Sequence, residues 1–465
     1  MFQTSTYIHR RSALVQGLGN GLFLFLGNEE SPMNYADNTY RFRQDSTFLY
    51  YFGIGLPGLA ALVDSETGTS TLFGDEMTMD HIVWMGRQKT LAAWAEESGI
   101  DAVQPARKLQ RVLEEAAAAG RAIHFLPPYR AENKMRLAAL TGMHTDVVAS
   151  QASVSFVKAV IAQRSVKSGE EIEELDLASN ISARMHLAAM QQARPGMFEY
   201  ELAATIHREA LAGGGDLAYP IILTVNGQIL HNHHHGNLLR EGRLVLNDSG
   251  AETARCYAGD LTRTFPVAKK FTALQKDLYN LVLAAYRDAV AILRPGVRYL
   301  DVHFQACTTL ARGLTELGLM KGNPEQAVQA GAHALFFQCG TGHMMGLDVH
   351  DMEDLGEQYV GYSEDLKKNT ALFGLKSLRL GKELQQGYVL TVEPGLYFIP
   401  ELIDQWRAEK RFSEFINYDE AEKYRDFGGI RVEDDYVITA DAARKLGDDL
   451  IIEAADIERV REAAF

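Results

Sequence analysis

The chain has 465 residues, 46% of them hydrophobic, which is enough to bury a large core and predicts two domains. Its formal net charge of −15, without a Lys/Arg-rich patch, argues against nucleic acid or an anionic membrane as a partner. No apolar run approaches the ~20 residues that span a bilayer. The 3 cysteines include no CxxC pair, which argues against a disulfide scaffold or a cysteine-based metal site and indicates a reducing, cytoplasmic compartment.

Residues 1 to about 165 alternate short β-rich runs with helical stretches. GLFLFLG, AALVDSETGTSTLFG and RAIHFLPP are strand-like, whereas KTLAAWAEESG and LQRVLEEAAAAG are helix-like, and this alternation predicts an α/β domain. The polar break RSVKSGEEIEEL follows, where Ser168 can cap a helix and Glu171 stands three residues later. We expect a long helix from there to about Gln192, an amino-terminal domain over 1–165 and a second domain over 166–465.

The second domain contains a faint internal repeat. A long helical stretch followed by ARPG at Ala193 to Gly196 recurs 100 positions later as a helical stretch followed by LRPG at Leu293 to Gly296. Pro and Gly stop the first helix and turn the chain into another. This is also a common way to make a turn, but the repetition fits a domain of two similar α/β halves with a site in the cleft between them.

Five metal-seeking residues of the second domain lie within apolar motifs. Four carboxylates and one imidazole make a hard, oxygen-rich ligand set, which suits Mn²⁺, Co²⁺ or Fe²⁺ better than a thiolate-bound structural zinc. The residues are Asp248 in LVLNDSG, Asp260 in YAGDLTRTFPV, His343 in GTGHMMGLDVHD, Glu393 in VLTVEPGLYF and Glu433 in GGIRVEDDYVIT.

The spacing of these residues suggests how they meet. Asp248 ends an apolar strand and Asp260 begins or lies in the next, so a β-hairpin would bring the aspartates together. Glu393 and Glu433 each belong to strand-like runs, and we expect them in neighbouring sheet positions, with His343 completing the cluster from a loop. A single such acid is typically a solvated surface group. Four of them inside apolar strands would be too costly to bury without cations.

These motifs resemble those of the pita-bread metallopeptidases, the family of aminopeptidase P, prolidase and methionine aminopeptidase. RPGMFEYEL, ILHNHHHG and YAGDLTRTFPV carry the resemblance, which covers nearly the whole chain. NYADNTYRFRQDSTFLYYFG resembles the amino-terminal domain shared by aminopeptidase P and prolidase. The resemblance implies a two-domain α/β fold, with a smaller amino-terminal α/β domain and a carboxy-terminal pita-bread domain that has a pseudo-twofold repeat.

The resemblance also implies a ligand set for two divalent metal ions, with Mn favoured and Co, Fe or Zn as the other candidates. Asp260 and Glu433 match the carboxylates that bridge the metals, and Asp248 matches a chelating ligand of one of them. His343 and Glu393 match the ligands of the other. Such ions lower the pKa of a bridging water and polarise the scissile carbonyl, and Glu393 would accept the water's proton.

Further residues match the family's substrate-contacting groups. His350 in LDVHD and His231 in ILHN match two histidines that are not ligands, hydrogen-bond the substrate and help move a proton to the leaving nitrogen. The tract HNHHHG alone could be a metal-binding run, but beside NG and GN it is more typical of a solvated turn, and only His231 matches a functional position. Arg431 would share a strand face with Glu433 and either orient that ligand or contact substrate.

Two activities of this family remain open. Arg379 in GLKSLR matches the prolidase arginine that binds the free carboxylate of a dipeptide, and the alternative is an ordinary surface arginine. YAGDLTRTFPV and GIRVEDDYVIT are closer to bacterial aminopeptidase P, which accepts longer peptides beginning Xaa-Pro. The resemblance thus implies an Xaa-Pro exopeptidase of the aminopeptidase P type, with a dipeptide-restricted prolidase as the alternative. Its partners would be proline-containing peptides, and analogy implies a homodimer or homotetramer.

Three departures from the family pattern bear on the site. The stretch from Asp248 to Asp260 holds one more residue than usual, which a turn or bulge can absorb. Cys339 stands four residues before His343, where relatives carry a histidine, so a substrate contact would be lost or replaced. Segments 356–387 and 400–427 are longer than in compact bacterial aminopeptidase P. A metal-free binding module or creatinase-type hydrolase on this fold is disfavoured because all five ligands are retained.

Overall fold

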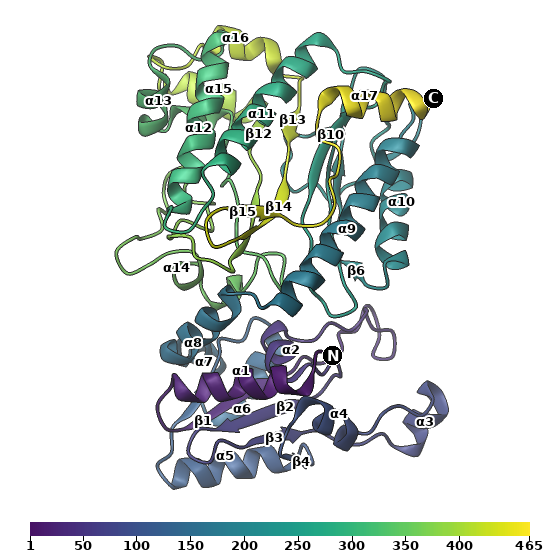
Figure 1. Cartoon of the computed structure of the whole chain (residues 1–465), viewed down its shortest axis with the longest axis vertical. Coiled ribbons are helices and arrows are strands. Elements are labelled where there is room, and N and C mark those ends of the chain that lie inside the picture. Colours follow the sequence, from purple (N-terminus) through teal and green to yellow (C-terminus); the bar gives the residue numbers. More distant parts are fainter. The chain divides into compact units, whose positions relative to one another are not determined.

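The computed structural model describes all residues from Met1 to Phe465 and separates them into two compact units. The first comprises Met1–Arg164 together with Met352–Tyr359, and the second comprises Ser165–Asp351 and Val360–Phe465. Figure 1 follows the chain through both. None of the helices combines the length and the apolar character that crossing a bilayer requires.

A five-stranded mixed sheet organises the first unit. Its strand order is β4-β3-β2-β1-β5, with β3 parallel to β4, β1 parallel to β5 and the other neighbours antiparallel. The strands are β1 (Leu22–Leu26), β2 (Ala60–Asp64), β3 (Ser70–Phe73), β4 (Ala102–Gln104) and β5 (Ile123–Phe125).

Helices complete the first unit and give the α/β composition expected from its sequence. Leu109 and Leu113, four residues apart on one face of α5, are buried in the same core cluster as the sheet residues Leu24 and Leu62. The helices of this part of the chain are α1 (Thr4–Gln16), α2 (Ser46–Phe52), α3 (Met79–Met85), α4 (Leu91–Ser98), α5 (Lys108–Ala118), α6 (Ala131–Thr141), α7 (Thr145–Val148), η1 (Ala149–Gln151) and α8 (Val154–Ser165).

The second unit is built on short antiparallel sheets. Two three-stranded sheets have the orders β10-β8-β7 and β11-β14-β15, and the remaining strands form the pairs β12-β13 and β6-β9. The strands are β6 (Asp216–Leu217), β7 (Ile222–Thr224), β8 (Leu244–Asp248), β9 (Ala251–Glu252), β10 (Thr262–Pro266), β11 (Val389–Val392), β12 (Gly395–Tyr397), β13 (Gly429–Arg431), β14 (Asp434–Ile438) and β15 (Ala443–Lys445).

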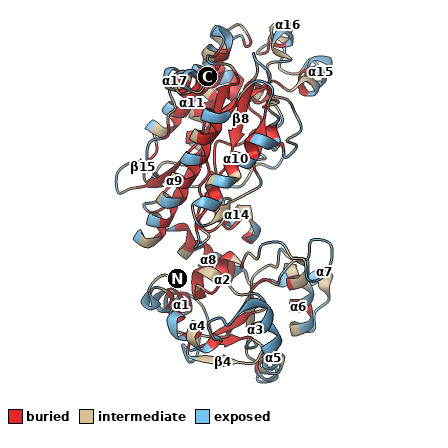
Figure 2. Cartoon of the chain, turned by 90° about the vertical axis from the view of Figure 1, so that its right-hand side faces the viewer, coloured by how far each residue is buried: buried red, intermediate tan, exposed pale blue.

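Helices cover these sheets. Figure 2 shows buried residues gathered on β8 and along α9, with exposed residues on the outer turns of the helices. Every residue of β8, β10 and β14 is buried. The helices are α9 (Gly169–Gln192), α10 (Glu199–Ala212), α11 (Ala273–Ala291), α12 (Tyr299–Glu316), α13 (Pro324–Ala330), η2 (Ala332–Leu335), α15 (Pro400–Ala408), α16 (Tyr418–Ala421), η4 (Glu422–Tyr424) and α17 (Ala454–Ala463). The short helices η3 (Glu353–Leu355) and α14 (Glu357–Val360) lie in and at the end of the segment that belongs to the first unit.

The predicted start of the long helix is confirmed. Ser168 is the N-cap of α9, its hydroxyl accepts from the backbone N–H of Glu171, and the Glu171 carboxylate accepts from the N–H of Ser168. This reciprocal capping box satisfies two backbone donors that the first turn would otherwise leave unpaired. The helix then runs to Gln192, as expected.

The internal repeat is present in the backbone. α9 and α10 form one helix pair, α11 and α12 form another, and each pair is joined through an RPG turn whose glycine has a positive φ, +93° at Gly196 and +85° at Gly296. The hydrogen bonds repeat as well. Gly196 N–H donates to the Leu239 carbonyl at 2.9 Å, and Gly296 N–H donates to the Leu384 carbonyl at 2.9 Å. The two halves therefore use the same local construction.

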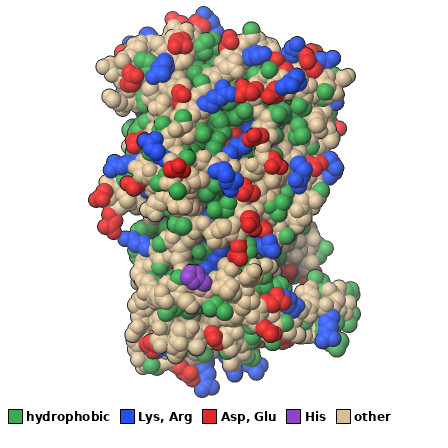
Figure 3. All heavy atoms as spheres, viewed as in Figure 1, with side chains coloured by type: hydrophobic (Ala, Val, Ile, Leu, Met, Phe, Trp, Pro, Cys, Tyr) green, Lys and Arg blue, Asp and Glu red, His purple; other side chains and the backbone are tan.

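The surface agrees with the acidic composition. On the face in Figure 3, acidic and basic side chains are interspersed over the second unit and do not segregate into a basic stripe. Of the charged residues, 46 are Lys or Arg and 61 are Asp or Glu. The face shown lacks the electrostatic pattern typical of nucleic-acid binding.

His186 joins α9 to β8 and must stay uncharged there. Its Nδ1 accepts from the Asn247 amide at 3.0 Å, and its Nε2 donates to the Ser249 carbonyl at 3.0 Å. Burial and the charge of Arg263 lower the pKa of His186 to about 4. The unfolded chain binds this proton near pH 6.5, so the histidine's contribution to stability is complete above pH 6.5 and is lost as the pH falls towards 4.

A leucine at position 186 tests this assignment. We expect His186→Leu to lower the free energy of unfolding most at pH 7, and the gap to the parent to shrink by about 2 kcal/mol at pH 5. Urea titrations of the metal-depleted parent and variant at pH 7 and pH 5 measure the difference between their free energies of unfolding. Contributions from other titrating groups are common to both proteins and cancel in this difference. A gap independent of pH would contradict a neutral, buried His186.

Candidate metal centre

The first half of the second unit supplies two aspartates. Asp248 is the last residue of β8 and lies opposite Thr262, the first residue of β10. Asp260 stands two residues before β10, at the same end of the ladder. The expected antiparallel pairing is therefore present, although β9 lies in the connection, and it brings both carboxylates to one end of the sheet.

The second half supplies two glutamates in the same manner. Val392 at the end of β11 pairs with Asp434 at the start of β14, so Glu393 and Glu433 are the next residues beyond that ladder. Glu433 also joins the halves, because its N–H donates to the Thr262 carbonyl at 3.1 Å. The four acids thus come from strand ends that face one another.

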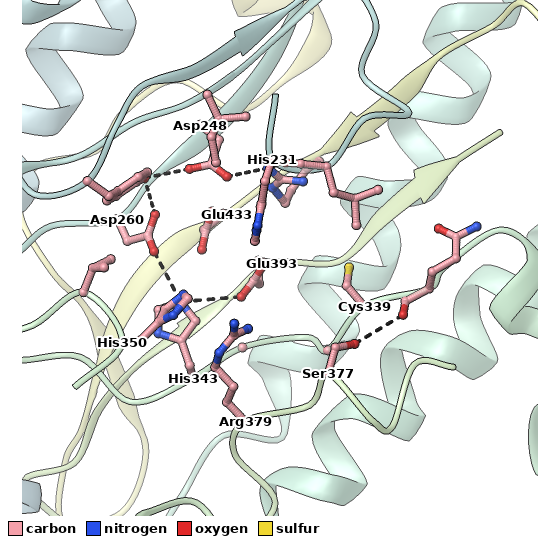
Figure 4. Close-up of a pocket in the computed structure, with 18 of the residues that line it drawn as sticks. His231, Asp248, Asp260, Cys339, His343, His350, Ser377, Arg379, Glu393 and Glu433 are labelled. Carbon is pink, nitrogen blue, oxygen red and sulfur yellow. Dashed lines mark hydrogen bonds and ion pairs between the residues drawn. The ribbon is translucent and has the colours of Figure 1, made fainter. Parts of the chain in front are cut away.

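These side chains converge on a pocket of about 460 Å³. Figure 4 shows the four carboxylates and the imidazole of His343 turned towards a common space. The structure brings all the predicted site residues to this pocket, which is lined by Asp248, Asp260, His343, Glu393, Glu433, His231, His350, Arg379 and Arg431. A cavity of this size is typical of sites for small ligands, which occupy about 300–1,000 Å³.

His343 presents one ring nitrogen to the acids. Its Nδ1 lies 3.0 Å from the backbone carbonyl of Met344, an acceptor, so Nδ1 carries a proton and Nε2 is the ring nitrogen that faces the acids. That Nε2 lies 3.3 Å from Asp260 Oδ2 and 3.6 Å from Glu393 Oε1. One imidazole nitrogen and two carboxylates therefore converge, and either a proton on Nε2 or a cation bound between the three groups would stabilise this arrangement.

The raised pKa values of the buried acids also indicate a cation site. Burial raises the pKa of Asp260, Glu393 and Glu433 above the usual carboxyl range, and the charges of neighbouring carboxylates raise it further. Ligand atoms of Asp260, His343 and Glu433 lie within 4.8 Å of one another. Because ionised carboxylates this close and this buried need compensating charge, the donor set fits divalent cations.

Three hydrogen-bonding residues that hold the acids were missed at the level of sequence. The Tyr219 hydroxyl lies 2.7 Å from Asp248 Oδ1 and 2.5 Å from Asp260 Oδ1. The Thr262 hydroxyl donates to Glu433 Oε2 at 2.6 Å. The Asp435 carboxylate accepts from the backbone N–H of Asp260 at 3.1 Å. The sequence signal for Asp435 was its place in the acidic run EDD, beside Glu433. The motif LAYP, which contains Tyr219, has no feature that indicates a functional residue.

Removing the Tyr219 hydroxyl is expected to weaken metal binding. Burial raises the pKa of this tyrosine, so the hydroxyl stays protonated and donates its one hydrogen to either of the two aspartates that it contacts. Loss of such an orienting partner costs about 10- to 100-fold in metal affinity. Competition with a fluorescent chelator measures the dissociation constant for Mn²⁺ in Tyr219→Phe and the parent. Equal constants would show that the hydroxyl does not position the ligands.

Arg431 contacts one of the acids directly. Its Nη2 donates to Asp248 Oδ2, its Nε donates to the Thr262 hydroxyl at 3.2 Å and its Nη1 donates to the Tyr397 hydroxyl at 2.7 Å. Its side chain is buried. Arg431 and Glu433 were expected on one face of a strand, and both side chains do line the pocket. The carboxylate that pairs with Arg431, however, is that of Asp248.

The remaining histidines differ in their surroundings. His350 packs edge-on against His343, with ring centroids 4.3 Å apart. His231 lines the pocket, and desolvation together with the charge of Arg431 lowers its pKa. In the tract that follows, His233 also lines the pocket, His234 is exposed, and His235 Nε2 lies 3.0 Å from the Ile221 carbonyl.

The long segment 356–387 forms one wall of the pocket. Phe373, Lys376, Ser377 and Arg379 all come from it. In Figure 4 the guanidinium of Arg379 is directed towards the carboxylates. Cys339 lies in the same pocket, and burial raises the pKa of its thiol to about 12, which keeps it uncharged.

Comparisons with known proteins assign both parts of the chain. The family model described as "Metallopeptidase family M24" matches residues 173–440, and the one described as "Aminopeptidase P, N-terminal domain" matches residues 7–124. Among curated proteins, the human Xaa-Pro dipeptidase is 32% identical, covering 92% of this chain and 86% of its own. The Xaa-Pro aminopeptidase of Escherichia coli strain K12 is 32% identical, covering 98% and 97%.

Solved structures give the same assignment. A low-pH form of E. coli aminopeptidase P superposes with a TM-score of 0.82 at 30% identity, covering 100% of this chain and 99% of that one. Pseudomonas aeruginosa aminopeptidase PepP has a TM-score of 0.81 at 27% identity, with the same coverage. The expected two-domain pita-bread architecture is confirmed. The chain therefore belongs to metallopeptidase family M24, whose members bind divalent metal ions.

Proposed function

We propose that this enzyme hydrolyses the bond between an amino-terminal residue and a following proline, and that Xaa-Pro dipeptides are its best substrates. Two kinds of relatives, an Xaa-Pro dipeptidase and an Xaa-Pro aminopeptidase, support the bond cleaved. The position of Arg379 supports the preference for dipeptides.

Two divalent cations, with Mn²⁺ favoured by the hard ligand set, are the proposed cofactors. Asp260 and Glu433 would bridge them, Asp248 would chelate one, and His343 and Glu393 would complete the other. Cations bound there would lower the pKa of a water molecule and polarise the scissile carbonyl. Co²⁺, Fe²⁺ and Zn²⁺ remain alternatives for the same ligands.

The protein's own side chains carry the proton transfers. Glu393, at the end of β11, is half-buried and reaches the pocket, so its carboxylate can accept a proton from the attacking water. His350 and His231 line the pocket on separate segments and would hydrogen-bond the substrate. One of them would then deliver a proton to the proline nitrogen as the peptide bond breaks.

Arg379 is the residue that would favour dipeptides over longer peptides. In an Xaa-Pro dipeptide the free carboxylate lies one residue beyond the scissile bond, and one residue spans at most about 3.6 Å. A group that binds this carboxylate must therefore line the same cavity as the metal ligands, as Arg379 does. Its charge also lowers the pKa of His231, which supports its position near the substrate-binding groups. A guanidinium can bind the carboxylate through two hydrogen bonds.

Aminopeptidase P activity on longer peptides is the second candidate. The observation that favours it is the length of the alignment. The aligned region covers 97% of the E. coli aminopeptidase but 86% of the human dipeptidase, so this chain matches the aminopeptidase over more of its length. A non-catalytic binding module is disfavoured, since all five ligand positions are occupied by metal-binding residues that meet in one pocket.

Product analysis separates these candidates. The purified, Mn²⁺-loaded protein is given an Xaa-Pro dipeptide and an Xaa-Pro-Yaa-Zaa tetrapeptide in parallel, and the products are identified by mass spectrometry. We expect the dipeptide to be cleaved and the tetrapeptide to persist. Release of the first residue from the tetrapeptide would assign aminopeptidase P activity, and cleavage of neither would favour a binding module.

Assembly is also proposed by analogy. We expect a homodimer or homotetramer, and light scattering coupled to size-exclusion chromatography gives the mass directly. A monomeric mass would show that a single chain is the working unit.

A further inference from the structure

A second group of metal-binding side chains lies outside the pocket described above. His303 and Cys307 stand four residues apart on one face of α12, and His333 lies in η2. One nitrogen from each histidine and the Cys307 sulfur lie within 4.8 Å of one another, and all three residues are buried. None of the three lines the carboxylate-rich pocket.

The pair on α12 has the separation of two ligands of one metal ion. His303 Nδ1 lies 2.8 Å from the Thr341 hydroxyl, which leaves Nε2 to face Cys307 Sγ at 3.5 Å. Zinc–sulfur and zinc–nitrogen bonds of about 2.3 and 2.0 Å at a tetrahedral angle place the sulfur and nitrogen about 3.5 Å apart. The observed contact therefore suits a tetrahedral ion without rearrangement of α12.

His333 supplies the independent observation. Both of its ring nitrogens are buried and have no hydrogen-bond partner. An unpaired buried polar group costs about 1–3 kcal/mol, which a core would normally avoid with an apolar side chain. The space beside its Nε2 is shared with His303, because a Cβ added at Gly374 would lie 3.7 Å from His333 Nε2 and 3.9 Å from His303 Nε2. Two imidazoles thus face the same small space.

We propose that His303, Cys307 and His333 form a second metal site that binds Zn²⁺. One thiolate and two imidazoles are a softer ligand set than the acids of the catalytic pocket, and they select zinc over manganese. The ion would replace the proton shared between Cys307 and His303, so that the thiol proton leaves to solvent and the sulfur binds as thiolate.

Protonation favours the imidazoles as ligands. Burial lowers the pKa of His303 to about 3 and that of His333 to about 4, so both rings are neutral and a cation does not compete with protons for them. Burial raises the pKa of the Cys307 thiol, and the charge of the ion would offset this. The cysteine spacing gave no sign of such a site because it uses a single cysteine, with histidines from two segments.

The site would brace the floor of the catalytic pocket. Thr341, which contacts His303, accepts the Glu393 backbone N–H at 2.7 Å through its own carbonyl. Zinc would therefore fix α12 to η2 and hold the loop from which Glu393 is positioned. The ion would not contact the substrate, since none of its three ligands lines the substrate cavity.

Cobalt spectroscopy tests the proposal, because the catalytic ligands include no sulfur and give no thiolate-to-Co²⁺ charge-transfer band. The full chain is expressed in Co²⁺-supplemented medium, so that the buried site fills during folding. The double variant Cys256→Ser/Cys339→Ser retains only Cys307, and we expect it to keep the parent's near-ultraviolet band. Cys307→Ser, with Cys307→Ala as a second variant, should lose the band. A parent without the band, or a double variant that loses it while Cys307→Ser keeps it, would overturn the assignment.

Zinc content gives a second readout that does not depend on activity. In an Asp260→Ala background, which disables the catalytic ligand set, we expect a single tightly held Zn²⁺ per chain and a fall in Tm when a chelator removes it during refolding. Adding His333→Leu should abolish both the zinc and the chelator effect. An Asp260→Ala protein that binds no zinc, or a His333→Leu variant that still binds it, would contradict the site.

Discussion

Replacing Asp260 with alanine is expected to reduce kcat/KM for an Xaa-Pro dipeptide by at least about 10³-fold, or about 4 kcal/mol of transition-state stabilisation. This carboxylate lies between His343 Nε2, at 3.3 Å, and the Tyr219 hydroxyl, at 2.5 Å. Its removal would leave Glu433 as the one remaining shared ligand of the proposed cations. Initial rates at saturating Mn²⁺ measure the loss, and undiminished turnover would exclude Asp260 from the catalytic centre.

Stability separates this effect from misfolding. Because burial and neighbouring acids raise the pKa of Asp260, its ionised form is unfavourable in the metal-free protein. The metal-free variant should be at least as stable as the metal-free parent, while the rise in Tm that Mn²⁺ produces in the parent should shrink. Asp277, an exposed acid on α11, provides the matched control, and Asp277→Ala should leave both activity and the Mn²⁺ response unchanged.

Replacing Arg379 with alanine is expected to lower kcat/KM for Xaa-Pro dipeptides by about 10²-fold, since truncating one partner of a desolvated charge pair costs about 2–5 kcal/mol. The loss should disappear with the same dipeptide amidated at its carboxyl end, because that substrate has no carboxylate to bind. Arg379→Lys should recover only part of the rate, as an ammonium group cannot form the two parallel hydrogen bonds of a guanidinium.

Lys376 is the control for this prediction. It lines the same pocket and carries the same charge, but it is exposed and its Nζ lies 3.8 Å from the Phe373 ring centroid. Lys376→Ala should change kcat/KM for both substrates alike. If Arg379→Ala affected the free and the amidated dipeptide equally, Arg379 would not be the carboxylate clamp, whereas cleavage of the Xaa-Pro bond would stand.

Local signals in the sequence predicted much of the fold. The Ser168 cap, the α/β alternation of the first unit and the two RPG turns each depend on residues close together in the chain, where hydrogen-bonding and φ preferences act directly. The candidate ligands could be selected because hard donors recur inside apolar strands. Their convergence depended on strand pairing, which the spacing of the strand-like runs suggested, whereas their roles as ligands came from the resemblance.

Interactions between distant segments were beyond sequence reasoning. Tyr219 reaches Asp260 across 41 positions, and Thr262 reaches Glu433 across 171. Neither pairing leaves a periodic or compositional trace, because the first depends on how the loop before β7 packs within one half and the second on how the two halves of the repeat meet. Arg431 illustrates the limit, since strand geometry placed it beside Glu433, yet it binds Asp248. The same reason hid His333, which meets His303 and Cys307 only through the packing of η2 on α12.

Metal dependence of dipeptide hydrolysis tests the central claim most directly. Protein stripped with a chelator is assayed by mass spectrometry for cleavage of an Xaa-Pro dipeptide while Mn²⁺ is added back. We predict no cleavage by the stripped protein and a rate that rises with Mn²⁺ occupancy of the catalytic pocket until it saturates. Undiminished cleavage by protein shown to hold no metal would contradict the proposed role of the carboxylate cluster.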